Sequence, residues 1–137
     1  EDIQTIIDLV DKEECYRWAL YRRPTIENWS SKRVTILGDA AHATLPYLAQ
    51  GAAMAVEDGA ILSRALEQNS DIADALQLYQ RNRTDRTARV VNTSDANRKR
   101  FHLDSVEQIR KSFTNRDEGA DRNGWLYSYN PLTVELK

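Results

Sequence analysis

Asp39 and its neighbours are the residues best suited to bind a ligand. Gly38 precedes Asp39 directly after the apolar run of residues 33–37, and Ala40 follows. In an open α/β sheet, ligands bind beyond the carboxyl ends of the strands, so a strand over 33–37 would place Asp39 at such a site. Glycine permits a sharp backbone turn there, and the Asp39 carboxylate can accept hydrogen bonds from sugar-like hydroxyl groups.

A predicted helix start supplies a second ligand-binding feature. Gln50 is followed by Gly51, Ala52 and Ala53, which open the apolar stretch 51–68. Apolar residues on almost every face predict a helix that is buried on most sides. The free N–H groups of its first turn and its positive dipole end favour an anionic ligand group. With the nearby carboxylate, this predicts a cofactor site; the alternative is an ordinary strand–loop–helix connection with a solvated aspartate.

Other chemical motifs are missing from the sequence. None of the five glycines forms a G-x-G pair, so neither a dinucleotide fingerprint nor a P-loop is present. His42, His102 and Cys15 are too few and too scattered for a zinc site, and we expect no metal. A nucleophilic pair of Cys15 and His42 would require a coincidence of folding.

Length and composition suit one globular domain. The chain has 137 residues, of which 41% are hydrophobic and 29% are charged, so general disorder is not expected. Nineteen basic and twenty-one acidic side chains leave a net charge of −2. This near-balance argues against nucleic acid or an anionic membrane as the main partner. No apolar run approaches the ~20 residues of a membrane span.

Two features bear on the cellular context of the chain. Cys15 is the single cysteine, so it cannot form an internal disulfide, which fits a reducing, cytoplasmic location. The sequence begins with Glu1 rather than Met, and we therefore expect it to be part of a longer protein.

Hydrophobic periodicity predicts the elements that must position the site. Asp2 is the expected N-cap of the first helix, and Pro24 follows the first strand. The predicted elements are helices over 2–10, 51–68, 72 to about 101 and 105–113, strands over 16–22 and 33–37, and loops over 38–50 and 114–123.

Two further segments have open interpretations. The stretch 81–100 carries seven basic residues and is expected to be a solvated helix face, with a nucleic-acid or partner-helix surface as the alternative. The closing segment 124–132 holds Trp125, Tyr127 and Tyr129. We expect these rings to pack onto the core; the alternative is that they line a cofactor cleft.

A series of motifs resembles the second flavin-binding motif of the single-component FAD-dependent aromatic hydroxylases. Its parts are residues 38–42, Pro46, residues 50–55, residues 57–58 and Leu62. The flanks 18–24 and 125–129 most resemble the salicylate hydroxylase branch. The resemblance covers nearly the whole chain, but only about the last third of a family member.

The resemblance implies roles for the residues that follow the strand. Asp39, with Gly38 and Ala40 beside it, is expected to bind the ribityl chain of FAD. Pro46 is expected to lie on the loop beside the isoalloxazine ring. Asp58 is expected to tie the buried helix to this loop, which is a structural role, and His42 is expected to pack rather than to transfer protons.

The resemblance also assigns the helix start. The amides of Gly51, Ala52 and Ala53 are expected to face the N1–C2=O edge of the flavin. Reduction places negative charge on that edge, and a fixed helix N-terminus stabilises such charge without reorganising. Gln50 touches flavin or substrate in one interpretation and neither in the other. Pro46 and Gln50 are therefore the candidate catalytic residues.

The implied fold class is α/β. The chain is expected to be the C-terminal portion of a glutathione-reductase-like FAD-binding fold, mostly helical with one or two strands, and incomplete on its own. Residues 1–24 are expected to end a substrate-domain segment that returns to the FAD domain. Residues 25–137 are expected to form the C-terminal part of the FAD-binding domain, with long C-terminal helices.

The implied function is that of a flavin-binding portion of an FAD-dependent, NAD(P)H-using aromatic-ring monooxygenase. Expected partners are a small aromatic substrate such as a phenolic acid, the remainder of the enzyme chain and, in one interpretation, a second copy in a homo-oligomer. The parent protein is expected to be an enzyme, and the chain alone to be inactive. The rival hypothesis is a non-catalytic helical interaction module or a truncated remnant of such an enzyme.

Overall fold

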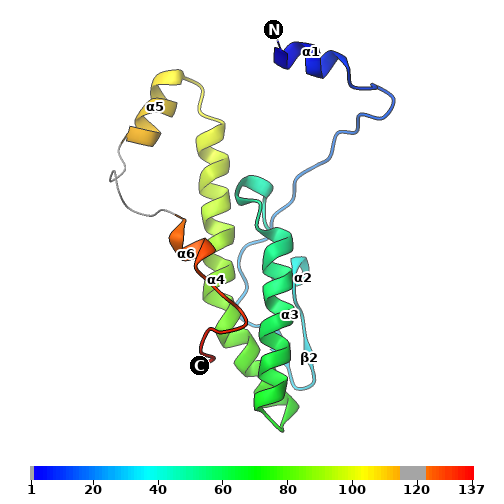
Figure 1. The fold of residues 1–137 in the computed structure, drawn as a ribbon, viewed down its shortest axis with the longest axis vertical. Coiled ribbons are helices and arrows are strands. Elements are labelled where there is room, and N and C mark those ends of the chain that lie inside the picture. The colour runs from blue at the N-terminus through cyan, green and yellow to red at the C-terminus, as the bar shows by residue number, and fades with distance from the viewer. Residues whose placement is uncertain (1, 115–122) are drawn as a thin grey trace.

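Two long helices form the body of the molecule. The computed structural model describes residues 2–114 and 123–137. Helix α3 (Gly51–Gln68) and helix α4 (Ile72–Phe101) lie side by side along most of the length of α3 (Figure 1). Residues 69–71 connect them, and Asp71 caps α4, its carboxylate accepting the Asp74 N–H at 3.1 Å. Both predicted helices are confirmed, including the extension of the second to Phe101. The expectation that residues 51–68 are buried on most sides is wrong, because only one face of α3 is buried and Val56 is 73% exposed.

The hydrophobic core lies between these helices and the segments that cross them. One buried cluster joins the two helices to the chain before them: Trp29, Ala41, Ile61, Ala65 and Tyr79. A smaller cluster, nearer the start of α3, joins them to the C-terminal segment: Met54, Val90 and Leu126. The buried core residues therefore come from positions 29 to 126 of the sequence, although the chain is largely helical.

The predicted strand over 33–37 is shorter and more exposed than expected. Strand β2 (Val34–Thr35) pairs with strand β1 (Ser30–Ser31) in an antiparallel hairpin, with Ser30 opposite Thr35. Val34 is 67% exposed, so the prediction of a buried strand is wrong for this chain. Because an apolar strand is buried only when further layers cover it, the apolar run alone could not secure its burial.

The predicted strand over 16–22 is also wrong. This segment contains no strand, and every residue in it is exposed. Alternating apolar residues form a strand only where a neighbouring strand supplies hydrogen bonds, and the described residues provide no such neighbour for this segment. Helix α1 (Asp2–Asp8) precedes it and stands apart from the helical body (Figure 1).

Short helices complete the structure. The predicted loop 38–50 contains helix α2 (Asp39–His42) and the 3-10 helix η1 (Pro46–Leu48). Helix α5 (Val106–Thr114) matches the prediction over 105–113, and helix α6 (Gly124–Tyr127) opens the closing segment. Most of the predicted loop 114–123 lies outside the described residues. None of the described helices is long and apolar enough to span a membrane.

The exposed apolar residues of the N-terminal segment lead to a first prediction. Trp18 and Tyr21 are 80% and 81% exposed, and leaving several hundred Å² of apolar surface uncovered forgoes about 5–10 kcal/mol of burial free energy. We expect residues 1–137, expressed alone, to self-associate as concentration rises in sedimentation velocity. A Trp18→Ser, Tyr21→Ser double variant should associate less. A chain that stays monomeric at every concentration would contradict this expectation.

Candidate functional site

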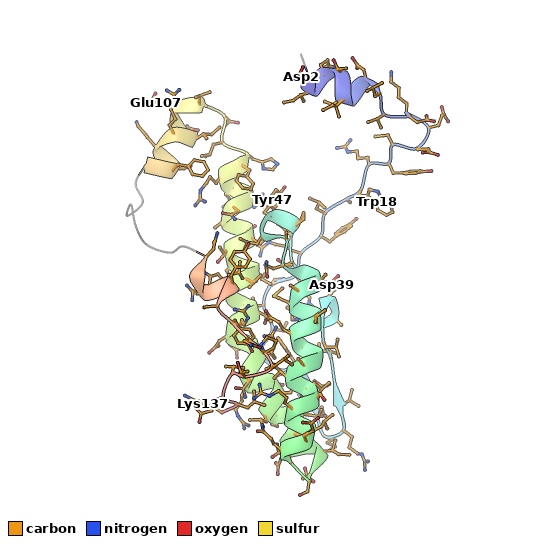
Figure 2. The ribbon with its side chains drawn as sticks, in the orientation of Figure 1. Asp2, Trp18, Asp39, Tyr47, Glu107 and Lys137 are labelled. Carbon is orange, nitrogen blue, oxygen red and sulfur yellow. The ribbon has the colours of Figure 1, made fainter. Side chains whose placement is uncertain are left out.

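Gly38 sets the direction in which Asp39 leaves the hairpin. Its φ of 57° lies in the left-handed region, which favours glycine. Its N–H donates to Asp58 Oδ2 at 2.9 Å. The chain then enters α2, and Asp39 stands exposed in the first turn of that helix. The glycine therefore makes the turn that was expected from the sequence, and Asp39 faces solvent at its end (Figure 2).

A pocket of about 650 Å³ gathers much of the predicted site. Asp39 lies in its wall together with Pro46 of η1 and with Gly51 and Ala52 of α3. These residues come from three elements, which the 38–50 segment brings together around the start of α3 (Figure 1). The complete lining is Leu20, Asp39, Thr44, Leu45, Pro46, Ala49, Gly51, Ala52 and Ala55.

The start of α3 supplies donors beside this pocket. Gln50 is the N-cap residue and its side chain makes no capping hydrogen bond. The Met54 N–H donates to the Gln50 carbonyl at 2.9 Å, which leaves the N–H groups of Gly51, Ala52 and Ala53 without a partner inside the helix. Free donors and the positive end of the helix dipole suit a ligand edge that carries negative charge.

Four predicted residues lie outside the pocket lining. Gly38 is buried behind it, and the Ala40 carbonyl accepts a hydrogen bond from the Arg23 guanidinium. Gln50 adjoins the lining at the helix start, and the side chain of Ala53 is exposed on α3. The structure thus brings together Asp39, Pro46, Gly51 and Ala52, with the other four as their chain neighbours.

Sequence patterns missed several pocket residues. Leu20 lies in the predicted strand that does not form, so its place in the wall depends on the path of an irregular segment. Ala55 follows Gly51 by four residues, and this spacing places both on one face of α3. That spacing was the available signal for Ala55. Thr44, Leu45 and Ala49 lie in the segment 38–50, which was predicted as a loop and has no periodic pattern.

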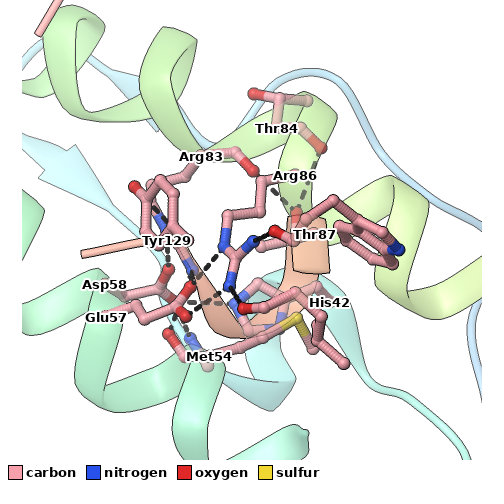
Figure 3. A network of polar contacts seen from close by, with 12 residues as sticks. His42, Met54, Glu57, Asp58, Arg83, Thr84, Arg86, Thr87 and Tyr129 are labelled. Carbon is pink, nitrogen blue, oxygen red and sulfur yellow. Dashed lines mark hydrogen bonds and ion pairs between the residues drawn. The ribbon is translucent and has the colours of Figure 1, made fainter. Parts of the chain in front are cut away.

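A buried ion pair joins α3 to α4 directly behind α2. Asp58 and Arg83 are both fully buried, and the Arg83 Nε donates to Asp58 Oδ1 at 2.7 Å. The second oxygen of Asp58 accepts the Gly38 N–H and lies 2.6 Å from His42 Nε2. One carboxylate therefore holds both ends of α2 (Figure 3). This confirms the expected structural role of Asp58 in tying the buried helix to the loop.

Glu57 extends the network toward the C-terminal segment. It accepts two hydrogen bonds from Arg86, at 2.7 and 2.8 Å, and lies 2.8 Å from Arg83 Nη2. Arg86 also donates to the Leu126 carbonyl at 3.0 Å, and its guanidinium lies 3.8 Å from the centre of the Tyr129 ring. The expectation of a solvated basic face over 81–100 is therefore wrong for Arg83 and Arg86, which point into the fold.

These contacts also decide how the aromatic segment packs. Tyr129 packs against the larger core cluster and Trp125 against the smaller one, as expected. Tyr127 departs from the expectation, because it is 72% exposed. The side chains of Trp125 and Tyr129 also line a shallow pocket of about 330 Å³, whose remaining wall comes from the C-terminal segment itself.

The network perturbs the ionisation of its members. Burial acts to raise the pKa of Asp58, but hydrogen bonds from His42, Gly38 and Arg83 outweigh it and hold that pKa below its ordinary value. Burial acts to lower the pKa of Arg83, but the hydrogen bond and charge of Asp58 outweigh it and hold that pKa above its ordinary value. Asp58 and Arg83 are therefore both charged at neutral pH. Burial, reinforced by the Asp58 charge, raises the pKa of Tyr79.

His42 lies in the packed interior. Its ring centre is 5.6 Å from that of Trp29, and its Nε2 faces Asp58. The buried Nδ1 has no hydrogen-bond partner within residues 2–114 and 123–137. The position of His42 away from the pocket lining favours the packing role over proton transfer. Within the described residues, no group of three or more His, Cys, Asp or Glu side chains is arranged to hold a metal ion.

Comparison with known proteins places this geometry in context. Residues 3–94 match the sequence family described as FAD binding domain. The chain is similar to 3-hydroxybenzoate 6-hydroxylase of Polaromonas naphthalenivorans (strain CJ2), with 44% identity over 119 residues, covering 83% of this chain and 30% of the relative. It is also similar to 6-hydroxynicotinate 3-monooxygenase of Bordetella bronchiseptica, with 42% identity over 97 residues, covering 69% of this chain and 25% of that relative.

A solved structure shows the same arrangement of elements. Klebsiella pneumoniae HpxO, complexed with FAD and uric acid, matches with a TM-score of 0.75 and 28% identity, covering 80% of this chain and 28% of that one. The mostly helical structure with its two-stranded sheet therefore matches part of an FAD-binding monooxygenase fold. The chain spans about 30% of the length of the curated relatives it matches.

The lowered pKa of Asp58 predicts how stability depends on pH. Ionised Asp58 stabilises the folded state above its ordinary pKa of about 3.9, and this contribution is lost as pH falls through the lower folded-state value. In the complete protein, we expect Asp58→Asn to cost about 3–5 kcal/mol at pH 7, because it leaves Arg83 incompletely paired. Urea unfolding should show a difference in unfolding free energy between wild type and Asp58→Asn that is constant from pH 7 to pH 5. This difference should become smaller below about pH 4.

The matched control for this prediction is Asp85→Asn, because Asp85 is an exposed aspartate on α4, the helix that carries Arg83. We expect its cost to be within about 0.5 kcal/mol at every pH. A gap between wild type and Asp58→Asn that already narrows between pH 7 and pH 5 would contradict the assignment to Asp58.

Proposed function

This chain belongs to the FAD binding domain family, and from that premise we propose that it forms the flavin-binding portion of an FAD-dependent, NAD(P)H-using aromatic-ring monooxygenase. The family match and the relatives named as hydroxylases and monooxygenases confirm the resemblance recognised in the sequence motifs. FAD is therefore the cofactor of the family. The activity of the whole protein, its electron donor and its substrate are part of the proposal.

The observation that carries the proposal is the convergence of Asp39, Pro46, Gly51 and Ala52 on one pocket. A carboxylate acceptor on one wall and free helix N–H donors on another fit a ligand with hydroxyl groups and an electron-accepting edge. These are the features of a ribityl chain joined to an isoalloxazine ring. The residues present therefore fit the flavin half of FAD.

Each residue then has a defined role in holding the cofactor. Asp39 accepts hydrogen bonds from ribityl hydroxyls, with the backbone of Gly38 and Ala40 shaping its turn. The amides of Gly51, Ala52 and Ala53 face the N1–C2=O edge. Because these donors are fixed by α3 before any charge develops, they stabilise negative charge there without reorganising. When bound, FAD supplies the redox chemistry of the reaction.

Pro46 and Gln50 complete the proposed site at the ring end. Proline fixes its own φ and has no N–H group, so Pro46 presents a rigid apolar surface to the ring. Gln50 stands at the N-cap of α3, where its free side chain can reach flavin or substrate. We assign these two residues to the reacting part of the site.

The finer features of the proposal follow from the same resemblance. We propose that residues 1–24 end a substrate-domain segment, supported by Leu20, whose side chain reaches the pocket wall. Residues 25–137 would then form the C-terminal part of a glutathione-reductase-like FAD domain. A small phenolic acid is the proposed substrate class, supported by a relative named as acting on 3-hydroxybenzoate. The cytoplasmic location and the homo-oligomer stay predictions.

A visible absorption spectrum of the complete protein tests the proposal directly. We expect flavin bands near ~375 and ~450 nm after reconstitution with FAD, and oxidation of NADH or NADPH that a phenolic acid accelerates. A protein that stays colourless with added FAD and oxidises neither nucleotide would contradict the proposal. That outcome would favour the rival, a non-catalytic helical module derived from such an enzyme.

Substitution of Asp39 tests the ribityl contact. In the complete protein, Asp39→Ala removes a charge-assisted hydrogen bond of about 1.5–3 kcal/mol. We therefore expect FAD affinity to fall by roughly ten- to a hundredfold when the apoprotein is titrated with FAD. Asp85→Ala, on the exposed face of α4, is the control and should bind FAD as wild type does. Unchanged affinity in Asp39→Ala would refute the assignment.

Substitution at the helix start tests the role of the amides. Ala52→Pro or Ala53→Pro removes one N–H from the first turn of α3, where proline is otherwise tolerated. We expect folding to survive and flavin reduction to slow by about tenfold in stopped-flow measurements. Ala73→Pro is the matched control, because Ala73 occupies the same position in α4, outside the pocket lining. Wild-type reduction rates in both α3 variants would exclude the amide role.

A further inference from the structure

Two side chains of α4 hold the loop that carries Pro46. Ser94 Oγ donates to the Leu45 carbonyl at 2.6 Å, and Asn97 Nδ2 donates to the Tyr47 carbonyl at 3.1 Å. Leu45 and Tyr47 are the immediate neighbours of Pro46 in the chain. The carbonyl groups on both sides of Pro46 are therefore bonded to one helix.

The spacing of the two donors explains how one helix reaches both carbonyls. Ser94 and Asn97 are three residues apart, which places them on one face of α4. Ser94 is fully buried, and the Leu45 residue it contacts is buried as well. A buried carbonyl needs a hydrogen-bond partner. Ser94 supplies the shorter of the two hydrogen bonds to the Leu45 carbonyl, at 2.6 Å, and the adjacent Thr44 hydroxyl donates the other at 3.3 Å.

The loop makes further contacts within η1 and with the end of α4. The Pro46 carbonyl accepts the Ala49 N–H at 2.9 Å, which closes the single turn of η1. The Tyr47 ring lies 5.9 Å from the rings of both Phe101 and His102 at the end of α4. Figure 2 shows Tyr47 of η1 beside α4. The part of the loop that lines the pocket therefore takes its position from the second half of α4.

This anchoring is separate from the one that holds Asp39. The Asp39 end of the pocket depends on Asp58 and Arg83, whereas the Pro46 end depends on Ser94 and Asn97. Arg83 and Ser94 are eleven positions apart, which corresponds to about 16 Å along a helix. The two ends of the pocket can therefore be perturbed independently.

We propose that Ser94 and Asn97 are positioning residues that align the Pro46 loop with the flavin ring. The inference rests on the proposed function, because Pro46 meets the ring only if the pocket holds FAD. A misplaced loop changes the geometry of the reacting groups, and small misplacements slow reactions strongly. Loss of either hydrogen bond therefore slows flavin reduction while the Asp39 end of the site retains the cofactor.

The experiment uses the complete protein saturated with FAD. Ser94→Val and Ser94→Thr are compared because valine and threonine have nearly the same shape and only threonine keeps the hydroxyl group. Asn97→Asp keeps the shape of the side chain and replaces the NH2 donor by an acceptor. Thr93→Ala is the control on the same helix, because the Thr93 hydroxyl donates only to the Arg89 carbonyl one turn earlier.

Two measurements separate alignment from general stability. The visible circular dichroism of bound FAD reports the surroundings of the ring, and stopped-flow mixing with NADH or NADPH gives the rate of flavin reduction. We expect Ser94→Val and Asn97→Asp to reduce flavin about tenfold more slowly, with altered visible dichroism. We expect their FAD dissociation constants to stay within about threefold of wild type. Ser94→Thr and Thr93→Ala should behave as wild type does.

The outcomes distinguish the inference from the proposed function. If wild type binds no FAD, the proposed function and the positioning role of Ser94 and Asn97 are both overturned. If wild type binds and reduces FAD while Ser94→Val and Asn97→Asp match it in dichroism and reduction rate, the positioning role is overturned and the proposed function stands. Variants that lower only the melting temperature would also overturn it. If Ser94→Val fails to fold, Asn97→Asp, which changes a partly exposed side chain, decides the question.

Discussion

The carboxylate of Asp58 is the point at which α2, α3 and α4 are joined. One oxygen accepts a hydrogen bond from the Arg83 guanidinium. The other accepts a hydrogen bond from the Gly38 N–H and faces His42. Burying this charge is costly unless it is fully paired, so the three elements must meet in one arrangement for the fold to form. Asp39 stands between Gly38 and His42, and the direction of its side chain therefore follows from the pairing of Asp58.

The same constraint explains why a helix rich in arginine packs inside the molecule. Arg83 and Arg86 carry planar guanidinium groups whose several donors satisfy Asp58, Glu57 and backbone carbonyls at once. The carboxylates come from consecutive residues of α3, and the C-terminal segment closes over them through Tyr129. Charge complementarity between the two helices thus supplements their small apolar clusters and fixes how α4 lies along α3.

Helix α4 consequently serves as the frame for both ends of the pocket. Its first half holds the α2 end through Arg83, and its second half holds the η1 end through Ser94 and Asn97. The N-terminal segment adds contacts at the same place, since Arg22 lies 3.4 Å from Asp95 and Leu20 reaches the pocket wall. A pocket built from short irregular pieces obtains a defined shape in this way, because each piece is bonded to one long helix.

Local sequence determined the parts of this protein that depend on residues close together in the chain. The periodicity of 51–68 and 72–101 predicted α3 and α4, and Gly38 and Gln50 marked where the chain turns toward the candidate site. The motif around Asp39, Pro46 and Gly51 also indicated the FAD-binding family through its resemblance to the family's second flavin-binding motif, and the match over residues 3–94 confirms that membership. These features need no knowledge of what lies opposite them in space.

Tertiary structure decided everything that depends on distant partners. Residues 16–22 and 33–37 have strand-like patterns, yet a strand needs neighbours, so the first forms none and the second only a short exposed hairpin. In the sequence, Arg83 cannot be told apart from the solvated arginines of the same basic stretch. It is buried because it lies opposite Asp58. Burial and pairing are relations between segments far apart in sequence. The family resemblance implied one of them, the contact of Asp58 with the loop, and the local patterns did not predict the others.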